Sequence, residues 1–582
     1  MEYFFDLGAH TRPVSTRSSH AQRWFDRGLA WSFAFHHEEA VRCFEAAAAA
    51  DPGCAMAYWG VAYALGPNYN KPWEFFDDAD LRQTVQRAHT AVERAGALCD
   101  GATPTERALI AALGERYPAS QAAQDCSIWN EPYAQAMRAA YDLAPDDLDV
   151  AALYADALMN LTPWRLWDLR TGEPAVGART LEAKAVLDRA LLTGAGAGHP
   201  GVLHMYIHLM EMSPTPEKAL VVADRLRGLV PDAGHLHHMP SHLDVLCGDY
   251  RKVVSGNSDA IRADEKYLRR AGAMNFYTLY RSHNYHFKIY GAMFLGQCEV
   301  ALETAAQLEA SIPEELLRVE SPPMADWLEG FLAMRVHVLI RFGRWGDILA
   351  LPMPGDAELY CVTTAMLHYA RAVAYSATRA TARAEAERGL FRDAVERVPP
   401  TRMLFNNTCR DILAIASAML DGELAYRQGE YDVAFACLER SVELDDSLPY
   451  DEPWGWMQPT RHAYGALLLE RGRVEEAEAV YRADLGLDDT LPRSLQHPGN
   501  VWALHGFHEC LVRLGRTGEA RIVAQQLTLA TALADVPVEA SCFCRLEATG
   551  TKSGSGPGSD CGSGPGSGPG SGPGSGSGSG CG

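Results

Sequence analysis

The sequence predicts an all-α fold made of repeated helical hairpins, and three observations carry this prediction. Segments such as 476–485 have the 3.6-residue periodicity of helices and good helix-forming residues, and no segment alternates like a strand over a useful length. A glycine recurs at intervals of 48, 47, 46, 40, 43 and 43 residues, at Gly248, Gly296, Gly343, Gly389, Gly429, Gly472 and Gly515. Five residues after five of these glycines stands an alanine, at Ala301, Ala394, Ala434, Ala477 and Ala520. A glycine allows a tight turn between two helices, and a small residue lets them pack closely.

Length, composition and charge limit the class of protein. A chain of 582 residues is long enough for several domains or one long repeat array, and 47% apolar with 22% charged residues is ordinary for globular proteins. The formal net charge of -22 disfavours binding to nucleic acids and to anionic membranes. The longest apolar stretch, 55–66, is shorter than the roughly 18 residues of a membrane span. We therefore expect neither a nucleic-acid partner nor a membrane partner.

The cysteines and the first residues indicate a cytoplasmic protein. The 14 cysteines are spread singly apart from Cys542 and Cys544, and no C-x-x-C pair occurs. Such spacing is typical of reduced thiols rather than of a disulfide framework. The first six residues, Met1 to Asp6, include two acids and no basic n-region, which does not resemble a secretory signal.

The N-terminal repeat carries a family resemblance. Residues 24–52 place the following side chains at the offsets of one repeat unit: Trp24, Gly28, Trp31, Ala40, Phe44, Ala47 and Pro52. This pattern resembles the tetratricopeptide repeat (TPR), and the resemblance implies a right-handed solenoid with a concave, ligand-binding groove. The period of about 44 residues is longer than the 34 of that family. The segments 54–59, 234–242 and 283–287 are similar to a subfamily that includes tetratricopeptide repeat protein 38, for which no activity is implied.

The expected organisation has four parts. Residues 1–19 form a lead-in segment, 20–535 the TPR-like array, and 536–552 a connecting segment. Residues 553–582 contain 14 Gly, 9 Ser and 4 Pro, which predicts a disordered tail. Irregular, aromatic-rich inserts near 66–80 and 160–180 interrupt the array, and they either plug the groove or line a site.

The histidines are concentrated in one part of the chain. Nine of the 20 lie between His199 and His286. In the register of the resembling repeats, positions 2, 5 and 9 of the first helix face the groove, and half of all histidines fall there. Residues three or four apart share one face of a helix, so adjacent repeats would bring their rows together. The predicted ligand-binding groove is lined by His204, His208, Glu211, His235, His238, His242, His283 and His286.

This cluster has two chemical interpretations. Neutral imidazole binds divalent transition metals, and His204, His208, His238 and His242 are the candidate metal ligands. Glu211 would then be a ligand or a general base, although no H-E-x-x-H motif is present. Alternatively, the histidines only hydrogen-bond neighbouring helices or recognise a carboxylate-bearing partner.

Two functions follow from these interpretations. The first is a scaffold that holds a protein segment or a small acidic ligand in the groove, as repeat arrays often do. The alternative is a metal-dependent enzyme, with Glu211 or a bound water in acid-base catalysis. Convergence of three or more imidazoles within about 4 to 5 Å would favour a metal, whereas histidines spread along the groove would exclude it. The sequence leaves the oligomeric state open.

Overall fold

The computed structural model describes residues 3–545, and helices joined by turns and loops make up most of them. The predicted disordered tail, 553–582, lies outside the described residues. The N-terminal half contains α1 (Ser19–Phe33), α2 (His37–Ala50), α3 (Ala55–Leu65), η1 (Trp73–Phe75), α4 (Asp78–Ala97), η2 (Cys99–Gly101), α5 (Pro104–Arg116), η3 (Cys126–Trp129), α6 (Asn130–Leu143), α7 (Leu148–Met159), α8 (Thr180–Leu191), η4 (Gly196–Gly198), α9 (Pro200–Glu211), η5 (Pro216–Ala219), α10 (Leu220–Leu226), α11 (Gly234–His238), α12 (Pro240–Leu246) and α13 (Tyr250–Ala271).

The C-terminal half continues the helical array. A two-stranded antiparallel hairpin, with Met403 opposite Thr408, is the one pair of strands among the described residues. The elements in order are α14 (Thr278–Phe294), α15 (Cys298–Ser311), α16 (Glu314–Leu317), α17 (Met324–Leu328), η6 (Glu329–Ala333), α18 (Met334–Arg341), α19 (Trp345–Ala350), α20 (Cys361–Ala377), α21 (Thr381–Arg397), β1 (Met403–Leu404), β2 (Asn407–Thr408), α22 (Cys409–Gln428), α23 (Tyr431–Asp446), α24 (Thr460–Glu470), α25 (Val474–Asp484), η7 (Arg493–Leu495), α26 (Val501–Arg513) and α27 (Thr517–Thr531).

The predicted all-α array of TPR-like hairpins is confirmed. Six of the seven recurring glycines stand between the two helices of a hairpin, and each has a positive φ, which a residue without a Cβ adopts at little cost. They are Gly248, Gly296, Gly343, Gly429, Gly472 and Gly515. The alanines that follow four of these turns, Ala301, Ala434, Ala477 and Ala520, are buried between paired helices.

The seventh glycine is an exception to the predicted pattern. Gly389 lies inside α21, and the turn of its hairpin comes earlier, where Arg379 has a φ of 63° between α20 and α21. This turn requires one residue with a left-handed backbone conformation, and here an arginine adopts that conformation instead of a glycine. The interpretation of Gly389 as a turn residue was therefore wrong, because the spacing alone did not show which residue carries the turn.

Close packing in the first hairpin explains why the repeat pattern has a glycine at position 28 and a phenylalanine at position 44. Helices α1 and α2 meet so closely that a Cβ on Gly28 would lie 2.7 Å from ring carbons of Phe44. Ser18 caps α1 by accepting a hydrogen bond from the amide of Ala21. The glycine of the repeat signature thus allows the phenylalanine two turns into the next helix to pack against it.

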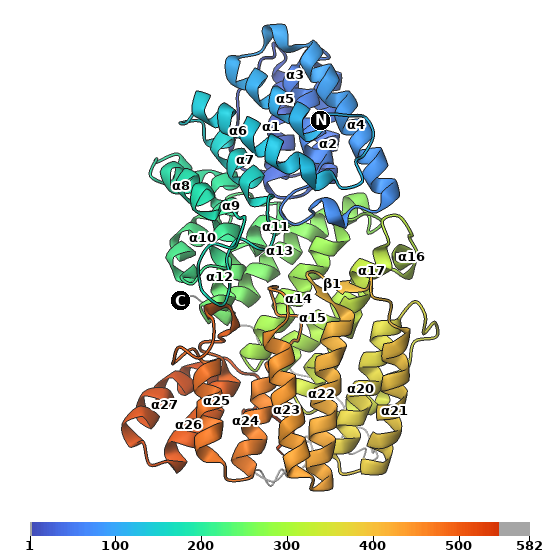
Figure 1. The fold of residues 1–582 in the computed structure, drawn as a ribbon, viewed down its shortest axis with the longest axis vertical. Helices are drawn as coiled ribbons and strands as arrows, with labels where there is room; N and C mark the ends of the chain where they lie inside the picture. The colour runs from blue at the N-terminus through green and yellow to red at the C-terminus, as the bar shows by residue number, and fades with distance from the viewer. Residues whose placement is uncertain (1–2, 546–582) are drawn as a thin grey trace, which may run out of the picture.

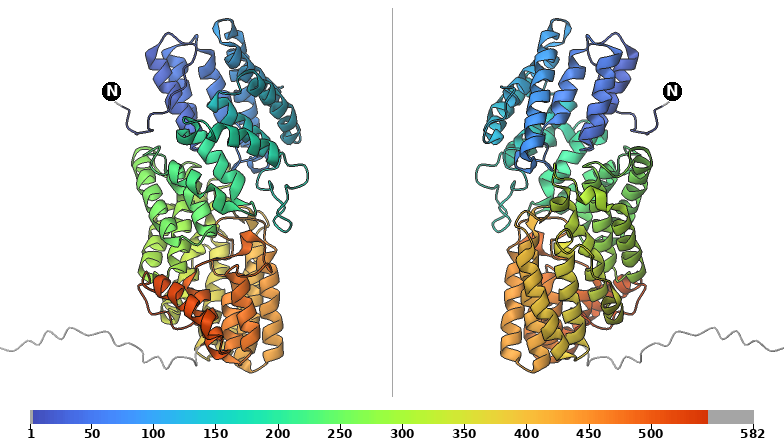
Figure 2. Two further views of the ribbon diagram at one scale, coloured as in Figure 1. Left: turned by 90° about the vertical axis from the view of Figure 1, so that its left-hand side faces the viewer. Right: turned by 90° about the vertical axis from the view of Figure 1, so that its right-hand side faces the viewer.

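Two hydrophobic cores lie end to end in an elongated molecule (Figures 1 and 2). The first core draws its residues from between Phe5 and Tyr280, and the second from between Val245 and Cys544. The two overlap in sequence over α12 to α14, which lie near the middle of Figure 1. The histidine-rich helices therefore stand where the two cores meet.

Among residues 3–545, no helix combines the length and the apolarity that crossing a membrane requires.

Candidate functional site

Four helices carry the clustered histidines. Helix α9 holds His204 and His208, and its start is set by Pro200 at its first position and by His199, whose Nδ1 accepts a hydrogen bond from the amide of Val202. Helices α11 and α12 follow each other directly along the chain, and the break between them falls at Pro240, which cannot continue the hydrogen bonding of a helix. Helix α9 packs on α12, and α11 packs on α13 and α14, so that the rows face one another.

The structure brings three histidines together in a first set, His204, His208 and His235. One ring nitrogen from each lies within 4.8 Å of the others. All three side chains are at most 2% exposed. The Nε2 atom of each ring is buried and has no hydrogen-bond partner among the described residues. Three buried imidazoles thus converge, and each has a ring nitrogen without a hydrogen-bond partner.

Hydrogen bonds on the opposite ring atoms orient two members of this set. Nδ1 of His204 lies 2.6 Å from the carbonyl oxygen of Phe33, so Nδ1 carries the hydrogen and Nε2 of the neutral ring carries a lone pair. Nδ1 of His208 lies 3.0 Å from Oε1 of Glu211. Metal-bound histidines in proteins characteristically have such a carbonyl or carboxylate on the ring nitrogen away from the metal.

Burial keeps these imidazoles neutral. It lowers the pKa of His204 to about 3. Burial, followed by the nearby charges of other histidines, lowers the pKa of His208 and His235 well below the ordinary value. The neutral imidazole is the form that binds metals, so the environment and the proposed ligand role agree.

A second set of histidines, His238, His242 and His283, lies directly beside the first. One ring nitrogen from each again lies within 4.8 Å of the others, and all three side chains are buried. The four tentative metal ligands of the sequence, His204, His208, His238 and His242, are thus divided between two sets, and each set gains a third histidine from another part of the chain.

Glu211 stands between the two sets, and His286 stands outside them. Oε1 of Glu211 faces His208, and Oε2 lies 2.7 Å from Nδ1 of His242. His286 belongs to neither set, because its Nε2 donates to Sδ of Met457 at 2.9 Å. Of the eight predicted groove residues, seven therefore converge and one turns toward a methionine.

A second buried carboxyl accompanies Glu211. Oε2 of Glu452 lies 3.6 Å from Nδ1 of His242. Burial, reinforced by the charge of Glu452, raises the pKa of Glu211 well above its usual range, and burial raises the pKa of Glu452 to about 8. Two carboxyls side by side in a buried site do not readily ionise together, so this pair holds a proton at neutral pH unless a cation binds nearby.

Aromatic side chains in unusual backbone conformations enclose the histidines. Four described residues other than glycine have a positive φ, and three of them are aromatic: Phe35 (53°), Trp164 (57°) and Phe405 (49°). The ring centroid of Phe35 lies 4.5 Å from that of His204, Trp164 lies 5.9 Å from His208, and Phe405 lies 4.3 Å from His283. Strained backbone of this kind concentrates at functional sites.

The two predicted inserts reach this cluster. Tyr69, in the insert near 66–80, is fully buried, with its ring centroid 4.9 Å from that of His208. Trp164, in the insert near 160–180, packs on Tyr69 with ring centroids 5.0 Å apart. Both inserts thus pack against His208 of the first set.

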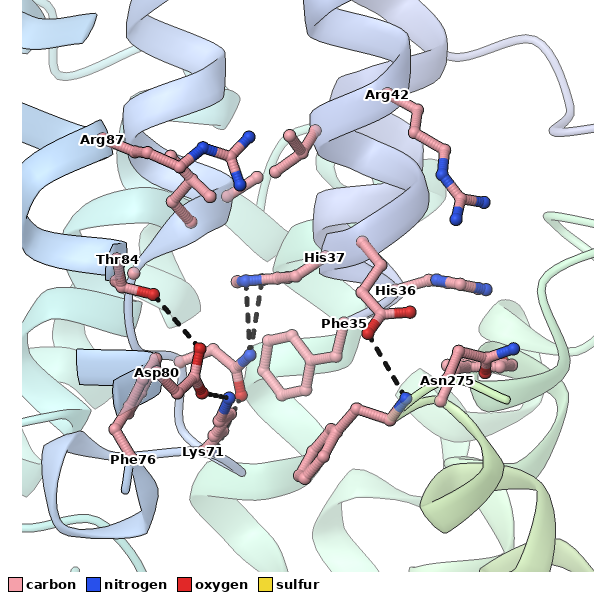
Figure 3. A pocket seen from close by; sticks show the side chains of 18 of the residues that line it. Phe35, His36, His37, Arg42, Lys71, Phe76, Asp80, Thr84, Arg87 and Asn275 are labelled. Carbon is pink, nitrogen blue, oxygen red and sulfur yellow. Dashed lines mark hydrogen bonds and ion pairs between the residues drawn. The ribbon is translucent and has the colours of Figure 1, made fainter. Parts of the chain in front are cut away.

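An open cavity of about 480 Å³ lies on the other side of Phe35 (Figure 3). Phe35 and Tyr280 line it, and both rings also pack on His235, at centroid distances of 5.6 and 5.2 Å. The charged side chains along its wall are Glu38, Arg42, Glu45, Lys71, Asp80 and Arg87. Phe35 and Tyr280 thus contact both this solvent-accessible space and His235 of the first set.

Several site residues could not be identified from the sequence pattern. Phe35 stands at the first inter-helix turn, and Glu452 and Phe405 lie in connections between helices, so no repeat position pointed to them. The aromatic character of the inserts was the one signal that pointed to Tyr69 and Trp164.

A third group, near the chain start, has a structural explanation. His10 and His199 both contact Oδ1 of Asp149, at 2.9 and 3.1 Å, and Arg12 contacts its Oδ2 at 3.1 Å. Hydrogen bonds from the two histidines hold the pKa of Asp149 well below its usual range against the opposing effect of burial. The carboxylate is thus fully paired, which ties the lead-in segment to α7.

Comparisons with known proteins assign this chain to no family, so its class is described from its fold and its site. No protein-family model matches this chain, and no curated protein sequence matches it. The solved structures that match include "Structure of Naa15/Naa10 bound to HypK-THB", with 14% identity over 88% of this chain and 70% of that chain and a TM-score of 0.20. A TM-score this low supports no conclusion about function. The fold and site themselves define an all-α array of TPR-like hairpins with a buried histidine cluster.

Proposed function

We propose that this protein is metal-dependent: His204, His208 and His235 bind a divalent transition metal ion, which acts on a small molecule that enters from the cavity beside Phe35. The observation that carries this proposal is that one ring nitrogen from each of three buried histidines lies within 4.8 Å of the others, while Nε2 of each ring has no hydrogen-bond partner among the described residues. A tetrahedral zinc ion with Zn–N distances of about 2.1 Å needs ligand nitrogens about 3.4 Å apart, a spacing that small side-chain rotations would reach.

The donor set fits a catalytic rather than a purely structural metal. Three histidines leave a fourth position of a tetrahedral ion free for water or substrate, as in catalytic zinc sites. The adjacent carboxyls, Glu211 and Glu452, supply groups that could hold or move a proton. The metal, when bound, would supply Lewis-acid chemistry or an activated water.

Metal analysis of the purified full chain tests this proposal. We expect about one equivalent of a divalent transition metal to depend on His204 and His208, and to be lost in both His204→Ala and His208→Ala. His237→Ala is the matched control, because His237 lies on the same short helix as His235 but contacts the carbonyl oxygen of Pro231 instead. A metal content that is unchanged in both variants, or absent from wild-type protein after loading with Zn²⁺, would overturn the proposal.

A second candidate is a scaffold that binds a protein segment or a small acidic ligand. Three basic side chains, Arg42, Lys71 and Arg87, line the cavity, although each also has an acidic partner (Figure 3). Titration of metal-free protein with succinate and with inorganic phosphate distinguishes the two. Saturable binding that Lys71→Met abolishes, with no metal needed, favours the scaffold, whereas binding that requires Zn²⁺ favours the enzyme.

We also infer a cytoplasmic location and membership of the subfamily that includes tetratricopeptide repeat protein 38. The cysteines of the described chain are all free thiols, which supports a reducing compartment. The segments that resemble this subfamily, 54–59, 234–242 and 283–287, include four of the clustered histidines.

A further inference from the structure

The second set of histidines contains an unusually close pair of nitrogens. Nε2 of His238 lies 2.7 Å from Nε2 of His242, and a ring nitrogen of His283 lies within 4.8 Å of both. His238 and His242 are at most 1% exposed, and Nδ1 of His283 is buried with no hydrogen-bond partner among the described residues. Three imidazoles from three helices thus point into one small volume.

The neighbours of His238 determine which of its nitrogens carries the hydrogen. The side-chain amide of Asn257 donates through Nδ2 to Oγ of Ser241 at 3.0 Å and to the carbonyl oxygen of Val253 at 2.8 Å. Its Oδ1 therefore faces Nδ1 of His238, at 2.8 Å, and can only accept. Nδ1 of His238 is the donor, so Nε2 of the neutral ring presents a lone pair.

The neighbours of His242 have the same effect. Nδ1 of His242 faces Oε2 of Glu211 at 2.7 Å, and when a nearby cation keeps Glu211 ionised this oxygen accepts the hydrogen of Nδ1. Nε2 of His242 then presents a second lone pair to His238. With Glu211 ionised, the two lone pairs 2.7 Å apart face each other and together offer two ligands to a cation, whereas a proton on Glu211 lets Nε2 of His242 donate to His238 instead.

The surroundings are those of an enclosed metal site. The ring of Phe287 stacks on His242, with centroids 5.3 Å apart, and also lies 4.9 Å from His238. Phe405 covers His283 from the β1–β2 turn. An apolar shell of this kind excludes water and strengthens the interaction of a cation with neutral nitrogen ligands.

We propose that His238, His242 and His283 bind a second divalent transition metal ion, and that Glu211 orients one ligand of each ion. Oε1 of Glu211 contacts His208 of the first set, and Oε2 contacts His242 of the second. This inference deepens the proposed function, which supplies the first ion, and makes the site a two-metal centre of nitrogen ligands. Imidazole-only ligation suits zinc, with Co²⁺ as a spectroscopic substitute.

The test is a titration of metal-free, full-length protein with Zn²⁺ and with Co²⁺, with bound metal measured by elemental analysis and by the visible absorption of Co²⁺. Wild-type protein is expected to bind two equivalents. His238→Ala and His283→Gln should each retain one, His204→Ala should retain one, and the His204→Ala, His238→Ala double variant none. His237→Ala should keep both.

The outcomes separate this inference from the proposed function. One equivalent in wild type that persists in His238→Ala and His283→Gln overturns the second site and leaves the first intact, and it would mean that a proton joins His238 to His242. One equivalent that persists in His204→Ala but is lost in His238→Ala overturns the proposed function and retains the second site.

Glu211→Gln tests the shared positioning role. Loss of the outer partner of a metal-bound histidine weakens binding by about 10- to 100-fold, so both equivalents should weaken together. Weakening at one site only would overturn the shared role. Circular dichroism identifies any variant that fails to fold, and His283→Gln remains informative because His283 is the most exposed member of the set, at 8%.

Discussion

At the scale of single residues, Phe35 contacts both the cavity and the first set of histidines. Its ring stacks on His208 and His235 and lines the cavity wall, while its backbone has a φ of 53°. An L-residue other than glycine pays about 1 kcal/mol or more for the left-handed region. Holding the Phe35 ring in this position thus costs conformational energy, and backbone strain of this kind is typical of residues at functional sites.

We expect Phe35→Gly to open this wall. A chelator should remove metal faster from the variant than from wild type, because water reaches the nitrogens through the cavity. Phe35→Gly should also be more stable than Phe35→Ala by about 1 kcal/mol, since glycine tolerates the backbone conformation. Stopped-flow metal removal and denaturant unfolding measure the two effects.

Phe391→Ala controls for a general loss of stability, because Phe391 is a buried aromatic residue on α21 in the second core. Equal rates of metal removal from Phe35→Gly and from wild type would contradict the gating role of Phe35.

His337 provides a pH-dependent test that is independent of the metal ligands. Burial lowers the pKa of His337 to about 3, against an ordinary value near 6.5. Between these values the unfolded chain binds a proton that the folded chain does not, so stability is present above pH 6.5 and is lost as the pH falls. At pH 5, protonation of His337 in the unfolded chain lowers the free energy of unfolding by about 2 kcal/mol.

We therefore expect His337→Leu to lose less stability than wild type between pH 7 and pH 5, by about 2 kcal/mol. Denaturant unfolding at both pH values measures the difference. His20→Leu is the control, because His20 is exposed and stays in contact with water in both states. An identical loss in wild type and His337→Leu would show that the folded protein takes up the proton at this histidine.

At the scale of elements, the short helix α11 places the histidines of both sets. It begins at Gly234, where an added Cβ would lie 2.0 Å from Oδ1 of Asp264. That carboxyl cannot easily move, because Tyr277 donates to it at 2.9 Å and Asn284 at 2.7 Å. The absence of a side chain at Gly234 thus determines how close α11 lies to α13.

Gly234→Ala should displace α11 and weaken both metal sites. We expect a loss of about 1 to 3 kcal/mol in the free energy of unfolding, typical of overpacking, together with weaker Zn²⁺ binding measured by calorimetry. The matched control is Gly256→Ala on α13, where a Cβ would meet atoms no closer than 3.5 Å. That variant should keep its metal affinity and gain stability, because alanine favours helix. Normal Zn²⁺ affinity in Gly234→Ala would contradict this role of the glycine.

At the scale of the whole molecule, the metal centre joins the two hydrophobic cores. The first set of histidines lies on α9 and α11, and the second set lies on α11, α12 and α14. The aromatic residues Phe287, Tyr290 and Phe294 of α14 belong to the second core. A ligand that binds only the folded state stabilises it by an amount that grows with its concentration. Bound metal should therefore stabilise the contact between the two halves as well as the site.

We expect removal of metal to lower the free energy of unfolding. At a free Zn²⁺ concentration 100 times the dissociation constant, each site contributes about 2.7 kcal/mol. Unfolding followed with and without Zn²⁺ should show the sum of both sites, about 5.4 kcal/mol, in wild type and about half of that sum in His204→Ala. An equal response in wild type and in the His204→Ala, His238→Ala double variant would show that the stabilisation comes from elsewhere.

The sequence was sufficient to predict the fold class and most of the turns. Six of seven recurring glycines take the left-handed conformation between paired helices, and only Gly389 was misplaced, because Arg379 adopts that conformation at its turn. Convergence of the histidines was also predictable in outline, since residues three and four apart on a helix share a face.

The division of the histidines into two sets was not predictable. His235 joins His204 and His208, and His283 joins His238 and His242, at sequence separations of 27 to 45 residues. These groupings depend on how α9, α11, α12 and α14 pack on one another. Periodicity describes one helix at a time and contains no information about the angle at which two helices cross.

Local properties of the chain, namely backbone hydrogen bonding and side-chain periodicity, are enough to predict the helices, most hairpin turns and the helix faces that carry histidine. Packing between distant helices is needed to bury these histidines, to bring Glu211 into contact with one member of each set, and to place Phe35 against both His235 and an open cavity. Those properties arise from packing between distant segments and from left-handed turns at aromatic residues, which no local pattern encodes.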